Sequence, residues 1–158
     1  MTTDLDRKSG ARGPNVADIP PISGAYILAI RTARPVEITV RGLPAASLRP
    51  GWYAYAGSAR GPGGLAARIA RHLRIGKTPH WHVDRLTCAA ARIDALAFPG
   101  AYECLLLARL RDLPGATIPL PGFGASDCTA CPAHLVALAE PLALDAPYRT
   151  LTRRASCR

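Results

Sequence analysis

Residues 50–73, PGWYAYAGSARGPGGLAARIARHL, contain the change from a strand to a helix that decides the fold. Residues 52–58 (WYAYAGS) are aromatic and close to alternating, a pattern that predicts a β-strand. The segment GPGG at residues 61–64 ends this strand. Leu65, Ile69 and Leu73 then recur at intervals of four residues, so they form the apolar stripe of a helix that packs on a sheet.

Segments on both sides of this stretch have strand or helix patterns. The predicted strands are residues 24–32 (GAYILAIRT, with both faces covered), 36–40 (VEITV), 92–98 (RIDALAF) and 134–139. The predicted helices are a short one that opens at residues 78–79 and runs through Asp84, and a longer one over residues 102–113. Since short connections join the first three strands, we expect an α+β fold with a small antiparallel sheet of three or more strands flanked by helices.

The length of 158 residues fits one domain with tails. We expect this domain at residues 22–140. A polar stretch rich in Gly and Pro at residues 1–21 predicts a disordered N-terminal tail, and residues 141–158 are expected to form a basic C-terminal tail.

The chain has 20 Lys and Arg against 11 Asp and Glu, a formal net charge of +9. This surplus favours a polyanionic partner such as nucleic acid, although a basic protein from an Arg-rich proteome would show the same charge. No apolar run approaches the roughly 20 residues of a membrane span, and the N-terminus lacks an apolar signal segment, so we expect a cytoplasmic protein with no membrane partner. The odd number of cysteines, five, argues against a disulfide framework.

Glu103 is the most informative acidic residue. At helical spacing it shares a face with Leu106, Leu107 and Leu110. An unpaired buried carboxylate costs several kcal/mol (roughly), so Glu103 needs a cation, a hydrogen-bond partner or a metal ion. The alternative is a carboxylate at the edge of the stripe that caps the helix or pairs with an Arg.

Two further groups of residues have the chemistry of a phosphate site. Arg68 and His72 lie one helical turn apart, with Arg71 nearby, and Arg suits phosphate because its planar fork donates two parallel hydrogen bonds. Tyr26 opens the first predicted strand, and Tyr55 belongs to the strand at residues 52–58. The alternatives are a solvated cationic helix face and ordinary packing of tyrosines on a sheet.

The order of these residues resembles that of the GIY-YIG nucleases, in particular the small stand-alone Uri-type branch. The resemblance covers residues 22–138 and is carried by the runs PGWYAYAGSA, GPGGLAARIARH, HWHVD and PGFGASDC. Within it lie Gly24-Ala25-Tyr26, Tyr55-Ala56-Gly57, Arg68 with His72, and Glu103. Both tripeptides have Ala where the family name has Ile.

The resemblance implies a metal-dependent endonuclease that hydrolyses phosphodiester bonds in nucleic acid, DNA more often than RNA, one strand per active site. The resemblance implies Tyr26, Tyr55, Arg68 and Glu103 as catalytic residues, with Glu103 binding Mg²⁺ or Mn²⁺, and Gly57 as the residue that lets the backbone approach the site. From its place beside Arg68 we add His72 to the catalytic group. We also expect Ser58, Arg71, His80 and His82 to contact the substrate, although His80 and His82 could instead cap the short helix. The alternative is a non-catalytic nucleic-acid-binding module with the same fold, which zinc could stabilise.

Cys128, Cys131 and His134 have zinc-like spacing. A structural zinc site needs four ligands, so His80 or His82 would have to supply the fourth. The alternative is that these are ordinary loop cysteines.

Overall fold

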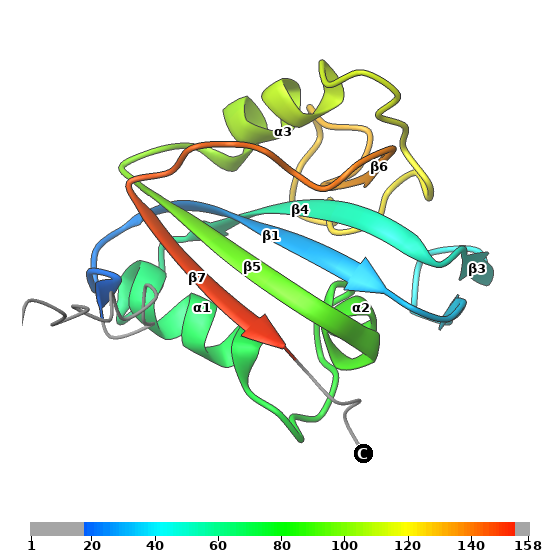
Figure 1. Cartoon of the computed structure of the whole chain (residues 1–158), viewed down its shortest axis with the longest axis horizontal. Helices are drawn as coiled ribbons and strands as arrows, with labels where there is room; N and C mark the ends of the chain where they lie inside the picture. Colours follow the sequence, from blue (N-terminus) through cyan, green and yellow to red (C-terminus); the bar gives the residue numbers. More distant parts are fainter. Residues whose placement is uncertain (1–17, 154–158) are drawn as a thin grey trace, which may run out of the picture.

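The computed structural model describes residues 18–153, and the side chains of residues 18–150 (Figure 1). Most of the N-terminal tail expected at residues 1–21 therefore lies outside the described residues. Ile19, within that range, is buried in the core. None of the helices in the described part of the chain is long and apolar enough to cross a lipid bilayer.

A five-stranded antiparallel sheet of order β6-β4-β1-β5-β7 forms the centre of the molecule. Its strands are β1 (Gly24–Thr32), β4 (Gly51–Ala59), β5 (Ala90–Pro99), β6 (Leu135–Leu138) and β7 (Tyr148–Arg153). Together with the three helices found in the described residues, this sheet confirms the predicted α+β class.

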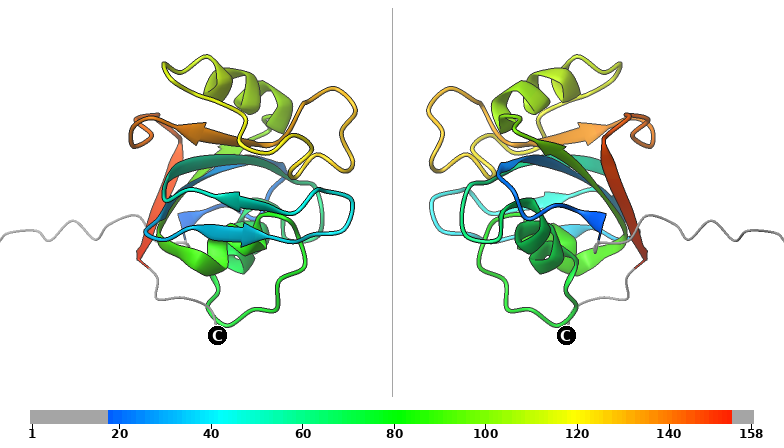
Figure 2. Two further views of the ribbon diagram at one scale, coloured as in Figure 1. Left: turned by 90° about the vertical axis from the view of Figure 1, so that its right-hand side faces the viewer. Right: turned by 90° about the vertical axis from the view of Figure 1, so that its left-hand side faces the viewer.

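Helices cover both faces of the sheet. Helices α1 (Gly64–Leu73) and α2 (Asp84–Ala89) lie on one face, and α3 (Glu103–Arg111) lies on the other (Figures 1 and 2). The alternation along β1 explains why all of its apolar side chains are buried. Leu28 and Ile30 join the core under α1 and α2, whereas Ile27 joins the core under α3.

The strand predicted at residues 36–40 does not belong to the main sheet. Within residues 18–153, strand β2 (Val36–Ile38) pairs only with β3 (Ala46–Leu48), and the two form a separate two-stranded sheet. The physical reason is that β1 is already hydrogen-bonded to β4 on one side and to β5 on the other. No edge of β1 is left for β2.

The structure corrects two further expectations. Strand β7 comes from the segment predicted as a C-terminal tail, and it pairs with β5 along residues 148–153, so the sheet continues past residue 140. The short helix predicted to open at residues 78–79 begins instead at Asp84. The Asp84 carboxylate accepts hydrogen bonds from the backbone N–H groups of His80 and Trp81, and this holds the preceding residues in a turn.

Candidate functional site

A cavity of about 280 Å³ opens where β1, β4, α1 and the start of α3 meet two loops. It is lined by residues from each of these segments: Tyr26, Tyr55, Gly57, Ser58, Arg68, His80, Trp81, His82, Glu103, Gly124, Ser126, Asp127, Cys128 and His134. The antiparallel pairing of β1 with β4 and the packing of α1 on both strands bring these distant parts of the chain together.

Tyr26 and Tyr55, from the paired strands β1 and β4, both line the cavity. In the strand register Tyr26 lies opposite Gly57, and a Cβ at Gly57 would overlap the Tyr26 ring. Burial raises the pKa of Tyr55 to about 12 and raises that of Tyr26 well above its usual value, with Arg68 opposing the rise in both cases. Both phenols are therefore protonated at neutral pH and would need a bound cation to act as bases.

Tyr26 is the outer member of a buried polar chain. Its hydroxyl lies 2.7 Å from Nε2 of His72, and Nδ1 of His72 lies 4.0 Å from Oδ1 of Asp84. Burial, helped by the charge of Lys77, lowers the pKa of His72 to about 3, so the ring is neutral at pH 7. With its proton on Nδ1, the neutral ring accepts a hydrogen bond from the Tyr26 hydroxyl at Nε2.

The two arginines of α1 have different surroundings. Arg68 lines the cavity, with its guanidinium carbon 4.4 Å from the centroid of the Trp81 ring. Arg71 donates two hydrogen bonds to Asp84, at 3.0 and 2.8 Å, and also stacks on Trp81 at 3.9 Å. The structure therefore places Arg68 in the cavity, whereas Arg71, expected to contact substrate, holds the loop that carries His80 and His82.

Glu103 opens α3 and faces the cavity, whereas Leu106, Leu107 and Leu110 are buried in the core. The carboxylate therefore does not have to be buried among the leucines, because Glu103 is the first residue of α3 and faces the cavity. Among residues 18–150 it takes part in no ion pair. A carboxylate oxygen is therefore available on the cavity wall to bind a metal ion.

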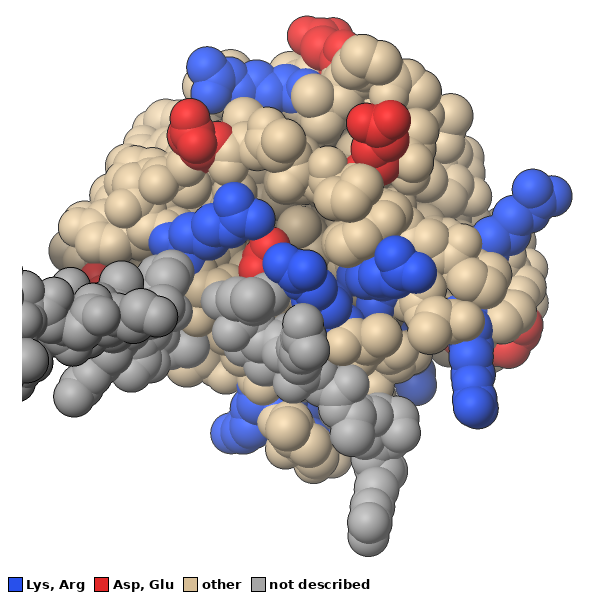
Figure 3. All heavy atoms as spheres, viewed as in Figure 1, with Lys and Arg blue, Asp and Glu red and all other residues tan. Residues whose placement is uncertain are grey.

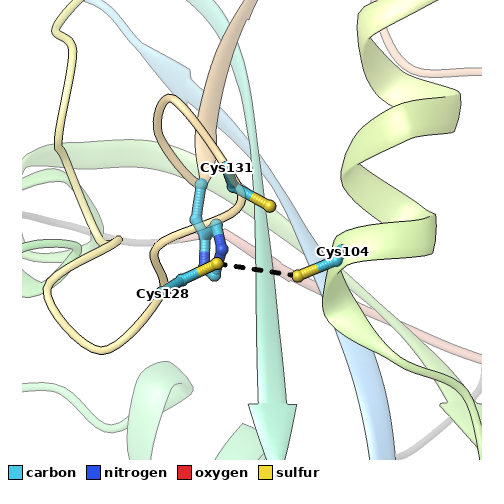
Figure 4. Close-up of side chains that lie close together, drawn as sticks. Cys104, Cys128 and Cys131 are labelled. Atoms are coloured by element: carbon cyan, nitrogen blue, oxygen red, sulfur yellow. Dashed lines mark hydrogen bonds between the residues drawn. The ribbon is translucent and has the colours of Figure 1, made fainter.

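Four residues beside the cavity form a cluster with metal-ligand chemistry, here called the Cys3His cluster: Cys104, Cys128, Cys131 and His134. One potential ligand atom from each lies within 4.8 Å of the other three. Figure 4 shows Cys104 reaching from α3 toward Cys128 and Cys131 on the loop. This cluster could hold a metal ion.

The fourth member of the cluster differs from the prediction. Cys104 fills the place assigned to His80 or His82, because the first turn of α3 lies against the loop. His82 instead accepts a hydrogen bond at Nδ1 from the backbone of Gly124, 3.0 Å away, and His80 is exposed. In the sequence, the one feature that could have pointed to Cys104 is its position directly after Glu103.

The thiols of the cluster differ in acidity. A backbone hydrogen bond from Ala130 lowers the pKa of Cys128. Burial and the neighbouring thiols of Cys104 and Cys128 raise the pKa of Cys131 to about 12. Three thiols this close cannot all ionise without a cation, because the thiolate charges repel one another. A bound cation would stabilise the three thiolates together.

Eight of the ten residues predicted for catalysis or substrate binding line the cavity. They are Tyr26, Tyr55, Gly57, Ser58, Arg68, His80, His82 and Glu103. His72 lies behind Tyr26, and Arg71 pairs with Asp84. Trp81, Gly124, Ser126 and Asp127 also line the cavity. They lie within the runs HWHVD and PGFGASDC, which carried the resemblance, but none of the four was predicted individually as a site residue.

Basic charge is not confined to the cavity. Figure 3 shows Lys and Arg side chains distributed over the face that carries β5 and β7, with acidic side chains between them. On these strands Asp94 pairs with Arg149 at 2.7 Å and with Arg92 at 3.5 Å. The net charge of +9 therefore does not by itself locate a binding surface.

Comparison with family models matches residues 25–156 to the family described as "Domain of unknown function DUF123", and the chain belongs to that family. Membership of the GIY-YIG nucleases, suggested by the tripeptides and the runs around them, is therefore wrong, since no model of that family matches. The short motifs that carried the resemblance did not identify the family. Comparisons with curated proteins and with solved structures found no match.

Proposed function

We propose that the cavity binds the sugar–phosphate backbone of a nucleic acid and hydrolyses one phosphodiester bond with the help of a divalent metal ion. The observation that carries this proposal is the convergence of Arg68, Glu103, Tyr26 and Tyr55 on one cavity. In-line attack on a phosphodiester requires a cation facing the phosphate oxygens, a positioned water and a Lewis acid. The cavity contains residues suited to each requirement.

Arg68 would neutralise the phosphate and the charge that develops on it. Its planar fork suits two phosphate oxygens, and stacking on Trp81 restricts its motion. Glu103 would bind Mg²⁺ or Mn²⁺, because these ions favour carboxylate oxygen and retain several waters. A bound metal ion of this kind polarises the phosphate and acidifies water.

Tyr26 and Tyr55 would orient the attacking water as hydrogen-bond donors or acceptors. The neutral ring of His72, whose Nε2 is 2.7 Å from the tyrosine oxygen, would fix the orientation of the Tyr26 hydroxyl. With its pKa lowered to about 3, the ring is too weak a base to take up the proton of the water at neutral pH. The oxygen of the water would form the new bond to phosphorus as the bond between phosphorus and the leaving oxygen breaks. The attacking water would release one proton to solvent, and the leaving oxygen would take up one proton from solvent. One such cavity cuts one strand.

A non-catalytic nucleic-acid-binding module is the second candidate. The position of Glu103 argues against it, because a carboxylate that faces bound phosphates repels them unless a cation lies between. A module that only binds would gain from a neutral or basic residue there.

The test is incubation of the full chain with supercoiled plasmid, single-stranded DNA and RNA, with Mg²⁺, with Mn²⁺ and with chelator. We expect metal-dependent cleavage, and a decrease of about 100-fold or more in Arg68→Ala, the size typical of losing one preorganised donor to a developing charge. Glu103→Gln should abolish the response to Mg²⁺.

Arg109→Ala is the matched control, because it removes the same charge from an exposed position on α3. It should retain full activity. Salt-sensitive binding of these substrates without cleavage under any metal condition would refute the hydrolase and support the binding module. Equal losses of cleavage activity in Arg68→Ala and Arg109→Ala would show that the loss results from the change in net charge and not from the position of Arg68.

A further inference from the structure

We infer that the Cys3His cluster binds one zinc ion, and that this ion joins the first turn of α3 to the loop that walls the cavity. The inference rests on the four side chains and does not depend on the proposed hydrolysis. Zinc is also distinct from the metal proposed at Glu103, since Mg²⁺ prefers oxygen donors and thiolates select softer ions.

The spacing of the ligand atoms fits a tetrahedral ion. Sγ of Cys104 and Sγ of Cys128 are 3.8 Å apart. With Zn–S bonds of about 2.3 Å, a tetrahedral zinc ion separates two sulfurs by about 3.8 Å. A disulfide would bring them to about 2.0 Å. The remaining ligand atoms lie within 4.8 Å of one another, so small side-chain movements would complete the shell.

His134 supplies an independent observation. The residue is only 5% exposed, and its Nε2 is buried without a hydrogen-bond partner among the described residues. Its backbone is held on both sides, by the carbonyl of Phe123 at 2.8 Å and the N–H of Ala56 at 3.0 Å. A buried ring nitrogen without a partner is costly, and coordination of a metal by the imidazole would offset that cost.

The composition of the cluster selects zinc and a structural role. Three thiolates and one imidazole form a donor set typical of closed zinc sites. Four protein ligands leave no open position for water or substrate, so the ion would not itself act on a substrate.

The position of the cluster gives the ion a mechanical role. Cys104 directly follows Glu103 on α3, whereas Cys128 and His134 lie on the loop before β6 and line the same cavity. Without the ion, Cys104 is joined to the loop by a weak thiol contact. Zinc therefore fixes the position of the Glu103 carboxylate relative to the loop residues Ser126 and Asp127.

The first experiment is elemental analysis of the full chain purified under reducing conditions. We expect one zinc per chain in the wild type and less than 0.2 (roughly) in Cys131→Ser, because a structural site loses most of its affinity for the metal when one of its four protein ligands is removed. Cys88→Ser is the matched control, since Cys88 lies on α2 outside the cluster, and it should keep its zinc. Substitution with Co²⁺ should give the intense visible and thiolate-to-metal absorption of a tetrahedral sulfur site.

A second measurement covers the case in which Cys131→Ser does not fold. Zinc is stripped from the wild type with chelator and reductant, and Zn²⁺ is returned to about 100 times its dissociation constant. We expect the Tm to rise by about 5–10 °C. Mg²⁺ alone should leave the Tm unchanged.

Absence of zinc from the wild type, with no Co²⁺ spectrum and no Tm response, would overturn the inference. A Cys104–Cys128 disulfide that persists under reducing conditions would overturn it as well. A zinc-loaded chain that cleaves no nucleic acid would refute only the proposed hydrolysis. An active chain without zinc would refute only the zinc site.

Discussion

Replacement of Asp84 by Asn tests how the cavity is supported. The Asp84 carboxylate is fully buried and joins α1 to the loop before α2. It accepts two hydrogen bonds from Arg71 and two from the backbone of His80 and Trp81. The substitution Asp84→Asn retains the shape of the side chain and removes its charge.

The expected loss of stability follows from the pKa of Asp84. Burial raises this pKa, but the hydrogen bonds from Arg71 and from the backbone of His80 and Trp81 outweigh burial and lower it from 3.8 to about 2. Each pKa unit corresponds to about 1.4 kcal/mol, so the ionised carboxylate stabilises the fold by about 2–3 kcal/mol. Because the pKa is lower in the folded state, this contribution is present above pH 3.8 and is lost as pH falls toward 2.

The assay is urea unfolding followed by Trp fluorescence between pH 7 and pH 3. We expect Asp84→Asn to be about 2–3 kcal/mol less stable than wild type at pH 7, and the difference to fall to about half by pH 3. Asp145→Asn, the same change on an exposed loop residue, should shift stability by no more than about 0.5 kcal/mol. A wild-type–variant difference that is absent at pH 7, or that does not depend on pH, would refute the reasoning.

Three other variants probe the buried chain behind the cavity. Gly57→Ala should cost about 1–3 kcal/mol by forcing the Tyr26 ring to move, whereas Gly61→Ala, where the nearest side-chain atom is 3.8 Å from the added Cβ, should be nearly neutral in urea unfolding. Tyr26→Phe should cost about 1 kcal/mol by removing the hydrogen bond to His72, and an unchanged unfolding midpoint would contradict that bond. The pKa of His72 falls from 6.5 to about 3 on folding, so its contribution to stability is present above pH 6.5 and is lost as pH decreases toward 3. His72→Gln should therefore lose less stability than wild type between pH 7 and pH 5, and parallel pH profiles would contradict this.

Local sequence patterns predicted most elements of the main sheet and its two longer helices. The alternation in residues 52–58 and the four-residue recurrence of Leu65, Ile69 and Leu73 correspond to β4 and α1. These patterns work because one turn of helix or two residues of strand repeat the same environment. The pairing of β2 and the strand β7 were missed, since the choice of a partner strand depends on which sheet edges remain open.

The sequence by itself determined that Cys128, Cys131 and His134 lie close together, because short spacing limits how far they can separate. Only the tertiary structure decided that Cys104 completes this group, that Asp84 pairs with Arg71, and that Arg68 faces the cavity. Contacts between residues that are distant along the chain depend on strand register and on the packing of α1 and α3 against opposite faces of the sheet. Those arrangements result from the burial of many apolar side chains at once, and no single segment of the sequence specifies them.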